Sequence, residues 1–195
     1  MWSNTRKQSE YANLRMLEDG FINYQKYVAP FDRGEPQTWK GRWQSPKIRF
    51  QREDIDLGDY PAPLIRGSNF PGFYMLPAWD AKAIALLDPL VGDAVEYLPL
   101  DCDEGEFWLV NVLDVADCLD WEQSELTYFD DGGLKGIGRY VFKPNCLEGH
   151  HMFRTPEHKY SRIFVSDEFK SLVENSDLVG LRFVPAPWEG RASVA

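Results

Sequence analysis

The chain has 195 residues, of which 44% are hydrophobic, and 31 acidic against 21 basic residues give it a net charge of −10. This composition excludes an intrinsically disordered chain, and no apolar run reaches the roughly 20 residues that a transmembrane helix needs. The negative charge disfavours nucleic acid and anionic membrane as partners and favours a cationic partner, although an acidic surface also serves solubility.

The N-terminal residues contain one periodic apolar segment. Tyr11, Leu14 and Leu17 recur at spacing three, and Gly20 can end a helix, which predicts a helix over Ser9 to Asp19. This N-terminal stretch lacks the apolar core of a signal peptide, so we expect a soluble, cytoplasmic protein.

A proline-rich segment follows, from Pro30 to Pro71. Its six prolines exclude a long helix and leave room for short extended pieces such as Lys47 to Phe50. Trp39 and Trp43 lie in this segment, and large aromatic side chains there are expected to pin irregular backbone onto the core.

Two stretches, Phe73 to Leu100 and Arg162 to Pro185, share one pattern. Each reads as a short apolar strand, a polar helix start, an amphipathic helix, a glycine-containing stop and a second strand. Ser166 stands where an N-cap is expected, immediately before two acidic residues that favour the helix dipole. The pattern predicts two strand-helix-strand units.

Between these units lie further strands. Glu106 to Leu113 is apolar enough for a central strand, and Ser124 to Phe129 with Ile137 to Phe142 predicts a hairpin around Asp130 to Gly133. The residues from Asp114 to Trp121 are expected to form a short helix or turn. Together these elements predict an α+β fold with a mixed, largely antiparallel sheet and packed helices.

The expected organisation has three parts. Residues 1–72 form an N-terminal helix plus a proline-rich irregular segment, residues 73–187 form the α+β domain, and residues 188–195 form a flexible tail.

Asp114, Asp117 and Asp120 recur at spacing three, so a helix would place them on one face, as a metal or acid-base site requires. A solvated acidic face is the simpler interpretation, because no histidine, glycine-rich turn or lysine accompanies them.

Cys146, His150, His151 and His158 are ligand types that zinc accepts, but their spacing does not give two matched ligand pairs. We therefore expect exposed loop histidines, no metal and no cofactor. The three cysteines, which include Cys102 and Cys118, are odd in number and lack a C-x-x-C motif, which favours free buried thiols in a reducing compartment.

The sequence contains no G-x-S-x-G, no P-loop and no G-x-G-x-x-G after a strand, and no histidine stands near Ser124 or Ser166 in sequence. We therefore expect a protein that is not an enzyme.

Several segments carry a family resemblance: Tyr97 to Leu100, Leu109 to Asp120, Ser124, Tyr140 to Lys143, Ile163 to Ser166 and Gly180 to Pro185. In their pattern and order they resemble family eleven among the immunity proteins of bacterial polymorphic toxin systems, a family first catalogued as a domain of unknown function. The resemblance covers roughly Phe73 to Pro187 and includes no reactive motif.

The resemblance implies a cytoplasmic protein that binds and neutralises a cognate toxin domain encoded next to it, with no catalytic residues. Toxins that attack nucleic acid are often basic, so an acidic inhibitor suits them. The candidate partner-binding residues are Asp103, Glu104, Asp130, Asp131, Trp39 and Trp43. The alternative is a small-ligand-binding protein or hydrolase that uses the acidic residues near Asp114 and Asp117.

Overall fold

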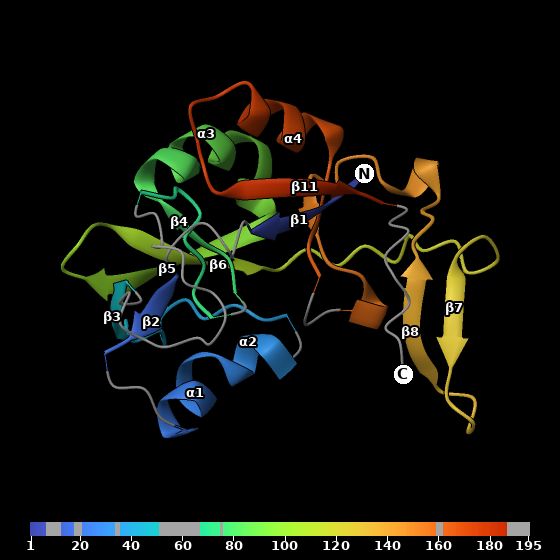
Figure 1. Ribbon diagram of the computed structural model, residues 1–195, viewed down its shortest axis with the longest axis horizontal. Helices are drawn as coiled ribbons and strands as arrows, with labels where there is room; N and C mark the ends of the chain where they lie inside the picture. Colours follow the sequence, from blue (N-terminus) through green and yellow to red (C-terminus); the bar gives the residue numbers. More distant parts are fainter. Residues whose placement is uncertain are drawn as a thin grey trace, which may run out of the picture.

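The computed structural model describes residues 1–6, 13–17, 21–33, 36–50, 67–74, 76–158 and 162–186. This part of the chain contains three β-sheets, with the α-helices on two opposite sides of the molecule (Figure 1). The described strand pairs are antiparallel except for β3 with β5. The fold is therefore α+β with a mixed, largely antiparallel arrangement, as the sequence predicted.

The largest sheet has five strands. In spatial order they are β2 (Leu14–Met16), β3 (Lys47–Phe50), β5 (Val95–Cys102), β6 (Phe107–Val112) and β4 (Ala78–Asp80). Strand β6 lies between β5 and β4, and Leu109 at its centre pairs with Leu98 on one side and Ala78 on the other. The predicted central strand over Glu106 to Leu113 and the predicted extended piece over Lys47 to Phe50 are both confirmed.

A four-stranded sheet lies beside it. In spatial order its strands are β11 (Leu181–Pro185), β1 (Trp2–Arg6), β10 (Phe164–Val165) and β9 (Met152–Phe153). Strand β1 thus comes from the start of the chain and lies between two strands from its other end. Residues 1–72 contribute strands to both sheets, and their division from residues 73–187 as a separate domain stays a prediction.

The two strand-helix-strand units are confirmed. Helix α3 (Ala81–Val91) continues into the 3-10 turn η1 (Gly92–Ala94), and its N-cap Asp80 accepts a hydrogen bond from the Ala83 amide at 2.8 Å. Helix α4 (Asp167–Glu174) begins after Ser166, whose hydroxyl accepts from the Phe169 amide at 3.1 Å. Both caps satisfy amide groups that a helix start leaves without an intrahelical partner.

Four shorter helical elements complete the described part: α1 (Phe21–Tyr27), α2 (Ala29–Arg33), η2 (Pro144–Cys146) and η3 (Pro156–His158). Figure 1 shows α1 and α2 at one end of the molecule and α3 and α4 at the other, with the two larger sheets between them. None of the described helices is long and apolar enough to cross a bilayer.

Gly180, immediately before β11, occupies a position that favours glycine for two reasons. Its φ of +111° is unfavourable for other residues, and a Cβ atom there would lie 1.9 Å from the Ser68 hydroxyl oxygen. This close approach lets Asn69 exchange hydrogen bonds with Val179 at 2.8 and 3.0 Å, which joins the segment before β4 to the segment before β11.

A separate hairpin consists of β7 (Glu125–Tyr128) and β8 (Leu134–Arg139). The predicted hairpin is confirmed, with its second strand starting at Leu134 instead of Ile137. Gly132 in the turn has φ +84°, and the Asp131 carboxylate accepts a hydrogen bond from the Gly133 amide at 2.9 Å. The turn chemistry read from the sequence is therefore the chemistry that closes the hairpin.

Three buried clusters form the core. One lies between the five-stranded sheet and α1–α2, a second lies between the sheets and α3–α4, and the third lies beneath the β7–β8 hairpin. The third cluster contains the buried residues Ala116, Cys118, Leu119, Ile137, Tyr140, Phe153 and Phe164.

Two local predictions were wrong. Leu14 to Met16, inside the expected helix from Ser9 to Asp19, form a strand in which Leu14 and Met16 are buried and Arg15 between them is not. The buried side chains alternate with a period of two because these residues pair with β3 as a strand. The segment from Asp114 is extended rather than helical, with single bridges from Val115 to Arg154 and from Leu119 to Phe142. A turn occurs only at its end, from residue 121.

The predicted tail over residues 188–195 lies outside the described residues. So does part of the proline-rich segment, residues 51–66.

Candidate functional site

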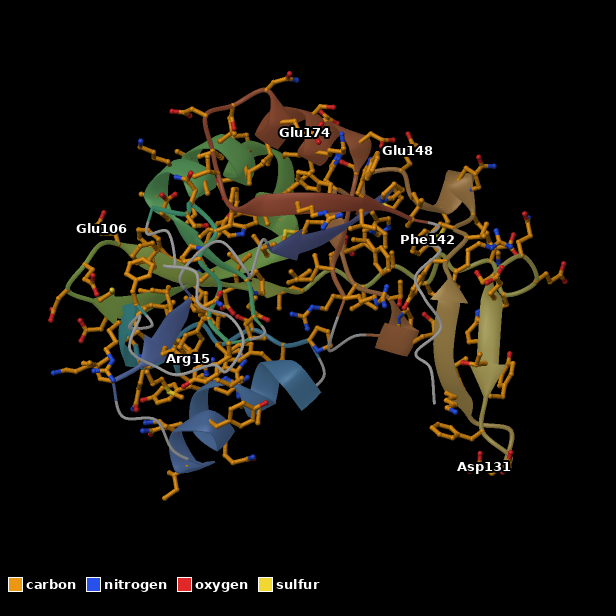
Figure 2. All side chains as sticks on the ribbon, viewed as in Figure 1. Arg15, Glu106, Asp131, Phe142, Glu148 and Glu174 are labelled. Atoms are coloured by element: carbon orange, nitrogen blue, oxygen red, sulfur yellow. A yellow bond between two sulfur atoms is a disulfide. The ribbon has the colours of Figure 1, made fainter. Side chains whose placement is uncertain are left out.

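The four acidic candidates lie in two different hairpin turns. Asp103 and Glu104 are exposed in the turn between β5 and β6, and Asp130 and Asp131 are exposed in the turn between β7 and β8. Figure 2 labels Glu106, near the first turn, and Asp131, in the second, at opposite ends of the longest axis of the molecule. The structure therefore does not bring the four carboxylates into one surface.

Trp39 and Trp43 are partly buried against the first core cluster. The Trp39 ring lies 5.2 Å from the Phe31 ring, and the Trp43 ring lies 5.8 Å from the same phenylalanine. The Trp43 indole also donates a hydrogen bond to the Pro99 carbonyl at 2.8 Å, while Arg42 lies 4.5 Å from the Trp39 ring centre. Both tryptophans thus pin residues 36–43 onto the body, as expected for large aromatics in irregular backbone.

Glu96 on β5 is the electrostatic anchor of this segment. Its carboxylate accepts hydrogen bonds from the Thr38 hydroxyl at 2.6 Å and from the Trp39 amide at 2.8 Å. The buried Asn111 donates to it at 3.1 Å and to the Gln37 carbonyl at 2.9 Å. Burial alone would raise the pKa of Glu96, but the hydrogen bonds, led by that from Thr38, outweigh it and hold the pKa below its ordinary value.

We expect Glu96→Gln to lower stability by about 1 to 2 kcal/mol at neutral pH, because it removes a charged acceptor of several hydrogen bonds. A depressed pKa adds stability above the unfolded-state pKa, and this stability is lost as pH falls through the folded-state value. The difference in melting temperature between wild type and Glu96→Gln should therefore shrink from about pH 7 to about pH 3. Glu106→Gln, at an exposed turn, is the control, and a difference for Glu96→Gln that stays constant with pH would contradict the argument.

Asp114 and Asp117 do not form a joint acidic site, because their segment is extended. Asp114 instead pairs with His150, its carboxylate oxygen 2.7 Å from Nδ1, and both side chains are partly buried. Asp117 is exposed, and Asp120 accepts hydrogen bonds from the amides of Glu122 and Gln123 at 3.1 Å. The three acids thus have separate structural surroundings.

His151 lies close to Ser166 in space although the two are distant in sequence. Its Nδ1 is 3.1 Å from the Ser166 hydroxyl and 3.7 Å from the Glu168 carboxylate. A catalytic triad needs the base to use one ring nitrogen for the nucleophile and the other for the acid. Here both partners approach the same nitrogen, and the serine hydroxyl already caps α4, so the arrangement is structural.

No group of three potential ligands that could hold a metal occurs among the residues that the structure describes. His150 and His151 have the separate partners given above, and the side chain of His158 is outside the described set. The expectation that the protein needs no metal stays a prediction.

The cysteine prediction was wrong for two of the three residues. Cys118 and Cys146 form a disulfide with their Cα atoms 5.5 Å apart. Cys102 is a free, partly buried thiol, and its burial raises its pKa, which makes it a poor nucleophile. The disulfide joins the segment that enters the β7–β8 hairpin to the segment that leaves it.

Sequence reasoning also missed a buried cation. Arg154 is 4% exposed, and burial lowers its pKa to about 10. Its guanidinium donates to the Phe31 carbonyl of α2 at 3.4 Å, while its backbone carbonyl accepts from the Ala116 amide at 2.9 Å. Arg154 therefore connects helix α2 with the segment that leads into the β7–β8 hairpin.

A comparison with models of known protein families shows to which class of protein the chain belongs. Residues 81–187, from α3 through β11, match the family model described as Immunity protein family (Imm11). This match covers more than half of the chain, and the chain therefore belongs to the Imm11 immunity protein family. A comparison with curated proteins gives no match. The resemblance read from the sequence is confirmed, and the family indicates a role in neutralising a toxin.

Proposed function

We propose that this protein protects the bacterium that makes it by binding a cognate toxin domain directly and blocking its activity. The observation that carries the proposal is the family match over the α+β body, residues 81–187. The net charge of −10 supports a cationic partner such as a toxin that must approach phosphate groups. Binding, rather than catalysis, is the proposed mode of action.

The candidate contact residues form three separate groups, of which we propose that one carries the interface: Asp103 with Glu104, Asp130 with Asp131, and Trp39 with Trp43. Because the two acidic turns lie at opposite ends of the molecule (Figure 2), a toxin domain of ordinary size would not use both turns in one compact interface. Charge reversal should therefore slow binding at one of the two turns and leave it unchanged at the other.

The test is co-expression with the toxin domain encoded by the adjacent reading frame. Cells that express the toxin domain alone should stop growing, and cells that also express this protein should grow. Copurification of the two proteins as one complex would support direct binding. Protection without a complex would overturn the proposed mode of action.

A hydrolase remains the second candidate because of one observation, the partly buried pair of Asp114 and His150 at 2.7 Å. Such a pair is the orienting half of a general-base arrangement. If protection works by binding, Asp114→Asn with His150→Gln should protect cells as well as wild type in the co-expression assay. Loss of protection by a variant that keeps the wild-type melting temperature would favour catalysis.

The compartment has two opposing indications. We propose the cytoplasm, where an immunity protein meets toxin made in or delivered to the same cell. The Cys118–Cys146 disulfide points instead to an oxidising compartment, because cytosolic thiols are kept reduced. Alkylating thiols in whole cells before lysis separates the two: a reduced pair supports the cytoplasm and an oxidised pair overturns it.

A further inference from the structure

The exposed aromatic residues of the described structure concentrate in one element. Trp121, Tyr128 and Phe129 are 44%, 53% and 56% exposed, and all three lie between Cys118 and Cys146. We call these residues 118–146 the arm, and residues 128–133 its tip. Tyrosine, tryptophan and phenylalanine are the residues most enriched at the centres of protein interfaces.

The arm is held rigidly at its base. The disulfide closes it, the Lys143 amide donates to the Cys118 carbonyl at 2.9 Å, and the Asp120 amide donates to the Val141 carbonyl at 2.8 Å. Along the arm, Ile137 is buried in the third core cluster. A lone two-stranded hairpin is only marginally stable, and the two backbone hydrogen bonds and the buried Ile137, which do not depend on the disulfide, support the arm before any partner binds.

The tip presents two exposed aromatic rings next to each other in sequence. Tyr128 pairs with Leu134 across the strands, whereas the Phe129 ring lies 5.9 Å from the ammonium of Lys135. Figure 1 shows the hairpin at the edge of the molecule with its turn pointing away from the body. Two exposed aromatic rings at a projecting turn suit insertion into a cleft better than contact with a flat surface.

The charge of the arm indicates what kind of partner surface it fits. The entering half, residues 121–131, contains the carboxylates of Glu122, Glu125, Asp130 and Asp131 and no lysine or arginine. On the returning half, Arg139 is engaged with Glu125 at 3.1 Å, and with Lys135 and Lys143 it brings the whole arm to five carboxylates against three cations. The tip therefore offers aromatic rings beside the carboxylates of Asp130 and Asp131, with the ammonium of Lys135 against one ring, and the net negative charge of the arm complements a cationic cleft with apolar walls.

We propose that the arm is the element that inserts into a cationic cleft of the toxin domain, with Tyr128 and Phe129 as its anchors. This inference rests on the proposed function and makes it specific. It assigns binding to the β7–β8 turn and not to the β5–β6 turn or to the Trp39 segment.

The experiment measures binding kinetics with the purified toxin domain encoded by the adjacent reading frame. Tyr128→Ser with Phe129→Ser should weaken binding roughly thirtyfold or more, because anchor residues dominate interface energies. Leu17→Ser with Ile22→Ser is the matched control, since these side chains are 43% and 81% exposed elsewhere on the molecule. The control should bind as wild type does, and both variants should keep the wild-type melting temperature.

A second pair tests the charge. Glu122→Lys with Asp130→Lys should slow association about tenfold at low salt and much less at high salt, whereas Asp103→Lys with Glu106→Lys at the other turn should leave it unchanged. If the aromatic variant proves unstable, these two charge-reversal variants still test whether the arm binds the toxin domain. Wild-type rates and affinities in the arm variants would overturn the assignment of the arm while leaving the proposed function intact. Failure of the wild-type protein to bind would overturn the proposed function and this inference with it.

Discussion

Leu109→Asp will destabilise the protein by about 2 to 5 kcal/mol, because it places a carboxylate without a partner in the middle of the five-stranded sheet. Leu109 is 1% exposed and is flanked by Leu98 on β5 and Ala78 on β4. The net stability of a domain is about 5 to 15 kcal/mol, so this cost removes a large part of it. We expect little soluble protein, and a strongly lowered melting temperature in what can be purified.

Leu17→Asp is the matched control for this experiment. Leu17 is 43% exposed, so the same change of side chain there should cost no more than about 0.5 to 1 kcal/mol. Urea unfolding of both variants measures the difference. Soluble Leu109→Asp protein that melts cooperatively at the wild-type temperature would contradict the central position of β6.

The elements that the sequence predicted well are those whose signals lie within a few residues. Asp80 and Ser166 cap α3 and α4 through amides three residues further along, and the turn at Asp130 to Gly133 closes its own hairpin. In each case the capping or turn residue lies next in sequence to the helix or turn that it stabilises. Patterns of this kind are readable without knowledge of the tertiary fold.

The elements that the sequence missed depend on distant partners. Strand β1 exists because it pairs with β10 and β11, near the other end of the chain. Glu96 anchors Thr38 and Trp39 across 58 and 57 residues, and neither end carries a local sign of the contact. The same holds for the candidate acids: exposure in a turn is readable from sequence, but the placement of two turns at opposite ends of the molecule is not.

The disulfide is an intermediate case, because a signal was present. Cys118 and Cys146 stand at equal distances in sequence from Gly132 in the hairpin turn. An antiparallel hairpin predicted around that turn brings the two flanking segments side by side, and in the structure the Cys118 carbonyl accepts a hydrogen bond from the Lys143 amide, three residues before Cys146. The odd number of cysteines and their wide spacing had suggested free thiols, whereas the hairpin supplies the geometry that pairs two of them.

Reduction of the Cys118–Cys146 disulfide will lower the free energy of unfolding by about 3.5 kcal/mol. The bond closes a loop with a sequence separation of 28, and the entropy that such a closure removes from the unfolded chain corresponds to roughly this value. Urea unfolding with and without dithiothreitol measures this change in free energy. The double variant Cys118→Ala with Cys146→Ala should unfold at about the midpoint of reduced wild type, and dithiothreitol should not change that midpoint.

The free thiol provides the control for this experiment. Cys102→Ala retains the disulfide and should respond to dithiothreitol as wild type does. Equal unfolding midpoints for oxidised and reduced wild type would contradict a stabilising role.

The strands of the arm should lose protection from hydrogen exchange first on reduction, because the bond closes the base of a two-stranded hairpin, whereas β6 is held by strands on both sides. Loss of protection at β6 before β7 would show that the bond supports the whole fold rather than the arm.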